Sequence, residues 1–126
     1  MANSSSYLVQ TRNRCVVGVY GDTPGTITFG ITNSAFDPTN HLDTRITNSS
    51  ASLSRVVYGL SGPNVVLRFG ATGGTAFVLG TNSSGSIDFE RITIPNNAVS
   101  PADGTFKVEI PATNTILTAY LEFVPF

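Results

Sequence analysis

The only histidine in the chain, His41, lies among oxygen-bearing side chains and is the first position to test for chemistry. Asp37, Asn40 and Asp43 share its short stretch. A serine hydrolase triad would have His41 as its single possible base, and the chain lacks the Gly-x-Ser-x-Gly turn that exposes a nucleophile. We therefore interpret His41 as a loop side chain beside Asp43.

Metal chemistry is poorly supported by the available ligands. Zinc prefers several His or Cys ligands, and this chain has one of each, Cys15 and His41, far apart. Calcium remains an alternative, since Asp37, Asn40 and Asp43 supply oxygens, but their spacing is not that of a helix-flanked calcium loop. We expect no metal and no cofactor.

Two further patterns resemble catalytic or phosphate-binding motifs. Asp88 and Glu90 share one strand face, as paired carboxylates for glycoside hydrolysis would, but Arg91 beside them favours a surface ion pair. The glycine-rich Gly70–Thr75 stretch lacks the Gly-Lys-[Ser/Thr] ending of a phosphate loop and is more typical of a hairpin loop. The sequence therefore predicts a protein that is not an enzyme, with an unrecognised enzyme as an alternative.

The composition of the chain limits the classes of partner that it can bind. Charged residues make up 12% of the chain, against about 25% in ordinary domains, and the net charge is −1. With one lysine, Lys107, and scattered arginines there is no basic patch, so we expect no nucleic acid partner.

The single Cys15 cannot form an intramolecular disulfide, and its strand context predicts a buried, inert thiol. No secretion signal or transmembrane run is evident, so we expect synthesis in the cytoplasm and no membrane partner.

The elements that must position any site are strands. No window shows helical periodicity, whereas short runs rich in Val, Ile, Thr, Phe and Tyr alternate with Gly, Pro, Asn and Ser. We predict one domain over residues 1–126, an all-β antiparallel sandwich resembling a jelly roll, with eight to ten short strands and very little helix. The predicted strands are Tyr7–Gln10, Arg14–Tyr20, Thr26–Ile31, Asp43–Thr47, Ser54–Leu60, Asn64–Phe69, Ala76–Leu79, Ser86–Phe89, Thr105–Ile110 and Ile116–Val124.

Alternation and turn chemistry refine this picture. Thr105–Ile110 and Ile116–Val124 show apolar residues on one face, and Ser54–Leu60 alternates imperfectly, which predicts burial on both faces in places or a bulge at Gly59. The turn-forming segments Gly21–Gly25 and Ser61–Asn64 predict hairpins between the strands that flank them.

Loops are the predicted places for partner contacts, because a rigid sandwich usually carries its binding groups there. The segment Thr32–Leu42 contains Phe36, which either plugs the end of the sandwich or meets another chain. A second segment, Ile94–Gly104, contains two prolines and is interpreted as an edge excursion or contact arm. The C-terminal Phe126 is expected to be buried against a neighbouring chain. The candidate partner contacts are Phe36, Asp37, Pro95, Asn96, Asn97, Pro101 and Phe126.

From Arg55 to the C-terminus the pattern resembles a known class of proteins. Val65–Phe69, the glycine-rich turn, Ala76–Leu79, Ser86–Phe89 and Ile94–Asn97 follow one another as they do in small β-sandwich virion structural proteins of tailed bacteriophages. The resemblance implies a capsid decoration or cement protein, located in the virion and assembled in several copies against the major capsid protein or another virion protein. It also leaves a neck, tail or fibre component open.

A carbohydrate-binding sandwich module is a further alternative. Such sites usually need stacking aromatic rings, and this chain has no Trp. The ring candidates are Tyr7, Tyr20, Tyr58, Tyr120 and Phe36.

Overall fold

Strands dominate the computed structural model, in which the described residues are 3–11, 14–31, 51–70, 72–73, 75–89, 94–95, 98–99 and 104–125. Nine strands have five or more residues, and three have two residues each. No helix occurs within these ranges. The all-β prediction is confirmed. Across the same ranges, no helix is long and apolar enough to cross a membrane.

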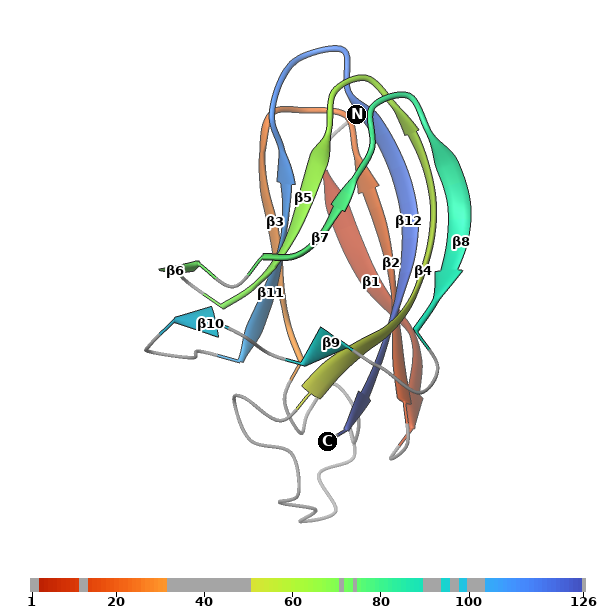
Figure 1. Cartoon of the computed structure of the whole chain (residues 1–126), viewed down its shortest axis with the longest axis vertical. Helices are drawn as coiled ribbons and strands as arrows, with labels where there is room; N and C mark the ends of the chain where they lie inside the picture. Colours follow the sequence, from red (N-terminus) through yellow and green to blue (C-terminus); the bar gives the residue numbers. More distant parts are fainter. Residues whose placement is uncertain are drawn as a thin grey trace.

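The larger sheet is antiparallel and has six strands (Figure 1). Its main path runs in the order β1-β2-β12-β4-β8, and the short β9 pairs with β4 beside β8. Its strands are β1 (Ser4–Thr11), β2 (Arg14–Gly21), β12 (Ile116–Pro125), β4 (Ala51–Ser61), β8 (Ser84–Asp88) and β9 (Ile94–Pro95).

A four-stranded sheet packs against the larger one, with the order β3-β11-β5-β7. Its strands are β3 (Gly25–Gly30), β11 (Thr105–Ile110), β5 (Val65–Phe69) and β7 (Thr75–Leu79). A two-stranded pair, β6 (Thr72–Gly73) with β10 (Ala98–Val99), extends beyond it. Consecutive strands lie in different main sheets at β2–β3, β3–β4, β4–β5, β7–β8 and β11–β12, and the chain returns to the smaller sheet between β9 and β11. The orders β2-β12-β4-β8 and β3-β11-β5-β7 are those of a jelly roll.

The two predicted hairpins at Gly21–Gly25 and Ser61–Asn64 are wrong. Each segment does turn the chain, but β2 and β3 lie in different sheets, as do β4 and β5. The turns are therefore crossings from one layer to the other. The prediction that Gly70–Thr75 belongs to a hairpin loop is correct, because the strands that flank it, β5 and β7, pair antiparallel.

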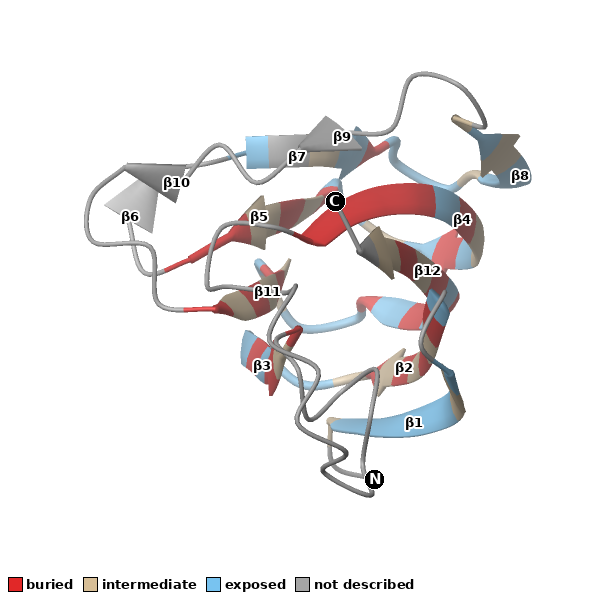
Figure 2. Cartoon of the chain, turned by 90° about the horizontal axis from the view of Figure 1, so that it is seen from below, coloured by how far each residue is buried: buried red, intermediate tan, exposed pale blue. Residues whose placement is uncertain are grey.

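Alternation along the strands builds one core between the sheets, visible in Figure 2 as buried residues that recur along the strands of both layers. Phe106 of β11 lies at its centre, because its ring centroid is 4.9 Å from that of Phe123 on β12 and 5.0 Å from that of Phe69 on β5. The predicted inward faces of β11 and β12 are confirmed. Their fully or almost fully buried residues are Phe106, Val108, Ile110, Leu117, Ala119, Leu121 and Phe123.

Strand β4 is buried on both faces over its first four residues, of which only Ser54 belongs to the predicted strand Ser54–Leu60. Within that predicted strand the alternation breaks at Val57 and Tyr58, which are both partly buried. The bulge, however, lies at Ser54 and not at Gly59, because Glu122 and Phe123 of β12 pair with Arg55 and Leu53 and leave Ser54 as the extra residue. The segment predicted as an edge excursion contains two short strand pairings, β9 with β4 and β10 with β6.

Candidate functional site

Most of the predicted contact residues lie outside the described part of the chain. This applies to Phe36, Asp37, Asn96, Asn97, Pro101 and Phe126, and also to His41, Asn40, Asp43, Glu90, Arg91 and the predicted strand Asp43–Thr47. Pro95 lies in β9, where its Cα partner is Ser52 of β4. Asp88 ends β8 and is exposed, with Arg55 of β4 as its Cα partner.

The tyrosines take different positions in the fold. The Tyr7 hydroxyl donates a hydrogen bond to the Gly30 carbonyl at 2.7 Å, and Tyr58 is half-buried with its hydroxyl 3.1 Å from Ser83 Oγ. Tyr20 and Tyr120 instead lie on the outer face of the larger sheet, in adjacent strands β2 and β12. The structure therefore brings together two rings that are a hundred residues apart in sequence.

Two bulges determine which side chains reach this outer face. Tyr7 and Val9 of β1 pair with Val17 and Val16 of β2, so Leu8 is the extra residue of its strand. Its side chain lies over Gly18, so that a Cβ atom at position 18 would be only 3.0 Å from Leu8 Cδ1. The bulge at Ser54 reverses the alternation of β4 in the same way, so that Leu53 faces the core and Arg55 faces outward.

The outer groove is a depression of about 320 Å³ on this face. Its floor is apolar, and the side chains of Arg14 and Arg55 line its margin near the start of β2. It is lined by Leu8, Val9, Arg14, Val16, Arg55, Val57, Tyr120 and Glu122. Leu8 is 51% exposed and Tyr120 is 48% exposed, so large apolar groups here remain in contact with water.

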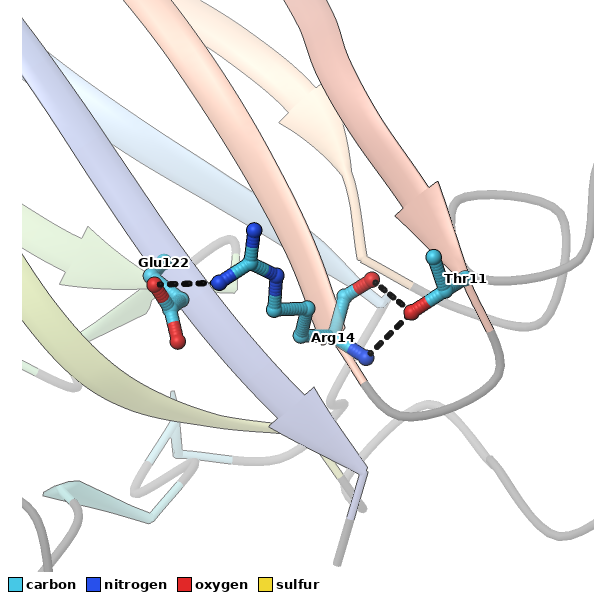
Figure 3. A network of polar contacts seen from close by, with 3 residues as sticks. All are labelled: Thr11, Arg14 and Glu122. Atoms are coloured by element: carbon cyan, nitrogen blue, oxygen red, sulfur yellow. Dashed lines mark hydrogen bonds and ion pairs between the residues drawn. The ribbon is translucent and has the colours of Figure 1, made fainter.

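The charged end of the outer groove lies where β1 ends and β2 begins, at Thr11 and Arg14, as Figure 3 shows. Thr11 Oγ1 accepts a hydrogen bond from the Arg14 amide and donates one to the Arg14 carbonyl, each at 3.2 Å. The Arg14 guanidinium then extends across to β12, where Nη1 lies 3.7 Å from Glu122 Oε1. Arg55 is the Cα partner of Glu122 on the other side. The carboxylate is thus placed between two arginine-bearing strands.

Beneath the groove, the inner face of β2 carries the single thiol. Cys15 is fully buried, as predicted, and desolvation by burial raises its pKa to about 12. Tyr7 also has a raised pKa, mainly through desolvation and secondarily through Cys15, while its hydrogen bond to Gly30 acts in the opposite direction. A thiol that stays protonated at neutral pH is a poor nucleophile.

A second, shallower depression adjoins the outer groove and shares Leu8 and Tyr120 with it. This Gly18 hollow measures about 210 Å³ and is lined by Ser4, Ser6, Leu8, Gly18, Val19, Tyr20, Thr118, Ala119 and Tyr120. The described residues contain no group of three or more His, Cys, Asp or Glu placed to hold a metal ion. The arrangement on this face is suited to binding by apolar contact and hydrogen bonding.

The outer groove was not identified from the sequence, although a signal for it exists. Consecutive apolar residues occur at Leu8-Val9, Val16-Val17 and Val56-Val57. Because neighbouring residues of a regular strand point to opposite faces, Val16-Val17 and Val56-Val57 each place one apolar group on the outer face and one on the core face. The bulge at Leu8 instead places both Leu8 and Val9 in the outer groove. Which pairs meet in one groove depends on strand order.

Comparisons with known proteins add little beyond architecture. No family model and no curated protein matches the chain. A cupin domain from Bordetella pertussis aligns at 9% identity and a TM-score of 0.45, over 97% of this chain and 93% of that one. A cupin domain from Schizosaccharomyces pombe has 7% identity and a TM-score of 0.45, over 98% and 61%. The Tobacco streak virus coat protein has 13% identity and a TM-score of 0.32, over 94% and 89%. No function is carried over from likenesses at this level.

Proposed function

We propose that this chain is a structural protein of a tailed bacteriophage particle, a capsid decoration or cement protein that stabilises the shell by binding it through the outer groove. It is made in the host cytoplasm, joins the virion in several copies and acts through protein contacts without catalysis. A neck, tail or fibre position is the alternative location for the same kind of contact.

The exposed apolar character of the outer groove carries the proposal. Leu8 and Tyr120, which both line the groove, are each about half exposed, although the core beneath them is already closed. Contiguous apolar surface with a polar margin is typical of protein interaction sites. Tyr and Arg are also the side chains that most often dominate interface energies, and the groove contains Tyr120, Arg14 and Arg55.

Architecture and composition are consistent with this function. Jelly rolls serve as viral capsid domains, although lectins and cupins share the fold, so the fold alone does not choose among them. The resemblance of the region from Arg55 to the C-terminus to phage virion proteins favours the use of the fold in a virus particle. A surface with few charges also limits the desolvation that extensive subunit contacts require.

The decisive experiment is to locate the protein in purified particles of the phage whose genome carries its gene. Mass spectrometry of the particles and cryo-electron microscopy are expected to find the chain at regular positions on the shell. Light scattering on the purified protein tests the related expectation of a homo-oligomer. Particles without the chain, together with a strictly monomeric protein that does not bind emptied shells, would overturn the proposal.

A further inference from the structure

The Gly18 hollow differs in chemistry from the outer groove beside it. None of its lining residues carries a charge, and three of them, Ser4, Ser6 and Thr118, carry aliphatic hydroxyls. Gly18 lies in the middle of β2 and adds no side chain to the outer face. The hollow is therefore a neutral depression that combines hydroxyl groups with aromatic rings.

Strand register places the two rings around this depression. Tyr120 is the Cα partner of Gly18, and Tyr20 is the Cα partner of Thr118, so the tyrosines are diagonal neighbours on β2 and β12. Diagonal positions on one face are about 7–8 Å apart. In the described part of the chain every ring pair in contact joins two phenylalanines, so neither tyrosine stacks on another ring. Tyr120 is 48% exposed, which leaves ring surface open to a ligand.

The hydroxyl groups lie on the two strands that flank β2. Ser4 and Ser6 of β1 are the Cα partners of Tyr20 and Gly18, and Thr118 lies on β12. All three residues are exposed. A pyranose presents C–H groups that pack on an aromatic face, and hydroxyls around its rim that exchange hydrogen bonds with short polar side chains. The absence of charge among the lining residues favours a neutral ligand over an anionic one.

We propose that the Gly18 hollow binds a neutral pyranose residue of a glycan, with Tyr120 and Tyr20 contacting its C–H groups and Ser4, Ser6 and Thr118 exchanging hydrogen bonds with its hydroxyls. The site is shallow, so one copy binds weakly, with a dissociation constant on the order of millimolar. Several copies in one assembly would raise the overall affinity through multivalency. This activity goes beyond shell binding, and because the outer groove and the hollow share Leu8 and Tyr120, one copy is expected to bind either the shell or the glycan.

The test uses the full chain and four neutral probes, the methyl pyranosides of glucose, galactose, mannose and N-acetylglucosamine. Saturation-transfer difference NMR detects binding, and amide shifts in a ¹⁵N spectrum locate it. At least one probe is expected to receive saturation and to shift the amides of Gly18, Tyr20, Thr118 and Tyr120.

Substitutions separate the site from the fold. Gly18→Ala adds a methyl group that approaches only the flexible end of Leu8, so we expect a folded protein with at least tenfold weaker probe binding. Tyr120→Ala is expected to have the same effect, while Tyr120→Phe retains the ring and most of the affinity. Ile116→Ala is the matched control, because Ile116 is 50% exposed on the same strand, outside the residues that line the hollow.

Three results would each overturn the proposal: no probe receives saturation, the shifted amides lie away from the hollow, or folded Gly18→Ala binds as the unmodified protein does. If Tyr120→Ala fails to fold, Gly18→Ala and the amide shifts still decide the question.

Discussion

The outer faces of the two main sheets cover the same core but differ in how much apolar surface they leave exposed. On the smaller sheet, Thr28, Lys107 and Arg68 are neighbours in register, and Arg68 forms an ion pair with Glu109. On the larger sheet, the corresponding surface is the outer groove with Leu8 and Tyr120. Not every residue follows this division, since Val78 of the smaller sheet is 44% exposed. One face is therefore mainly a solvated surface, and the other combines exposed apolar residues with the charged side chains of Arg14, Arg55 and Glu122.

The exposed apolar residues of the larger sheet are not needed to close the fold. Inward residues of both sheets, such as Leu121, Phe106 and Leu67, are already completely buried without any help from the outer groove. Apolar area left in water contributes no burial energy until something covers it. The outer groove is thus better explained by a partner than by stability of the isolated domain.

The largest expected effect comes from removing the core that both faces share. Phe106→Ala deletes the ring that contacts Phe69 and Phe123, and we expect unfolding free energy to fall by about 3–5 kcal/mol. Urea denaturation measures the loss. Lys107→Ala on the outward side of the same strand is the control and should stay within about 0.5 kcal/mol of the unmodified protein. Equal losses for the two variants would contradict the assignment of inner and outer faces on β11.

Alkaline pH weakens the same core through the thiol under the outer groove. The pKa of Cys15 is about 12 in the folded protein and close to its ordinary 9.0 when unfolded, so the unfolded chain loses its proton first. Stability is expected to be complete below pH 9 and to fall by about 1.4 kcal/mol per pH unit between those values, with Tyr7 adding to the loss above pH 10.

Thermal unfolding at a series of pH values measures this slope. Cys15→Ala provides the control, because it removes the titrating thiol and should abolish the fall between pH 9 and 10 and reduce it above pH 10, where Tyr7 still contributes. An identical alkaline slope in both proteins would show that Cys15 does not cause it.

Matched charge reversals test the comparison between the outer faces directly. Arg55→Glu places a second carboxylate beside Glu122 in the outer groove, and we expect binding to emptied capsid shells to weaken at least tenfold, or about 1.4 kcal/mol. Lys107→Glu changes the charge by the same amount on the smaller sheet and should leave binding unchanged. Co-sedimentation with the shells measures both. If the two variants bind equally well, the outer groove is not the contact surface.

The smallest expected effect compares two tyrosines of the larger sheet. Tyr7→Phe removes the hydrogen bond to Gly30 and should lower the unfolding free energy by about 1 kcal/mol. Tyr120→Phe should change it by less than about 0.5 kcal/mol, because the Tyr120 hydroxyl has no hydrogen-bond partner among the described residues. Parallel urea titrations distinguish the two, and a larger loss for Tyr120→Phe would reverse our assignment of their roles.

Local sequence patterns predicted where the strands lie better than they predicted which strands are adjacent in a sheet. Thr105–Ile110 alternates strictly, and the observed strand has the same bounds. Turn chemistry at Gly21–Gly25 and Ser61–Asn64 indicated correctly that the chain changes direction, yet both predicted hairpins are wrong. A turn-forming segment can return a strand beside its predecessor or carry it to the facing sheet, and the residues of the turn do not distinguish the two.

The candidate site was less accessible to sequence reasoning than the fold. Predictions concentrated on loops, and most of those residues, such as Phe36 and Phe126, lie outside the described ranges, so their role as contacts stays a prediction. The outer groove is built from four strands, the consecutive β1 and β2 and the distant β4 and β12. Only strand order and two bulges bring its residues together.

By itself, the sequence determined that this protein is a β-sandwich with a buried thiol and few charges, because alternation and composition act through local geometry and solvation. The tertiary structure decided which strands are neighbours, where Leu8 and Ser54 interrupt the register, and that Tyr20 and Tyr120 share one outer face. Those features depend on contacts between distant segments, which are selected by packing of the whole core.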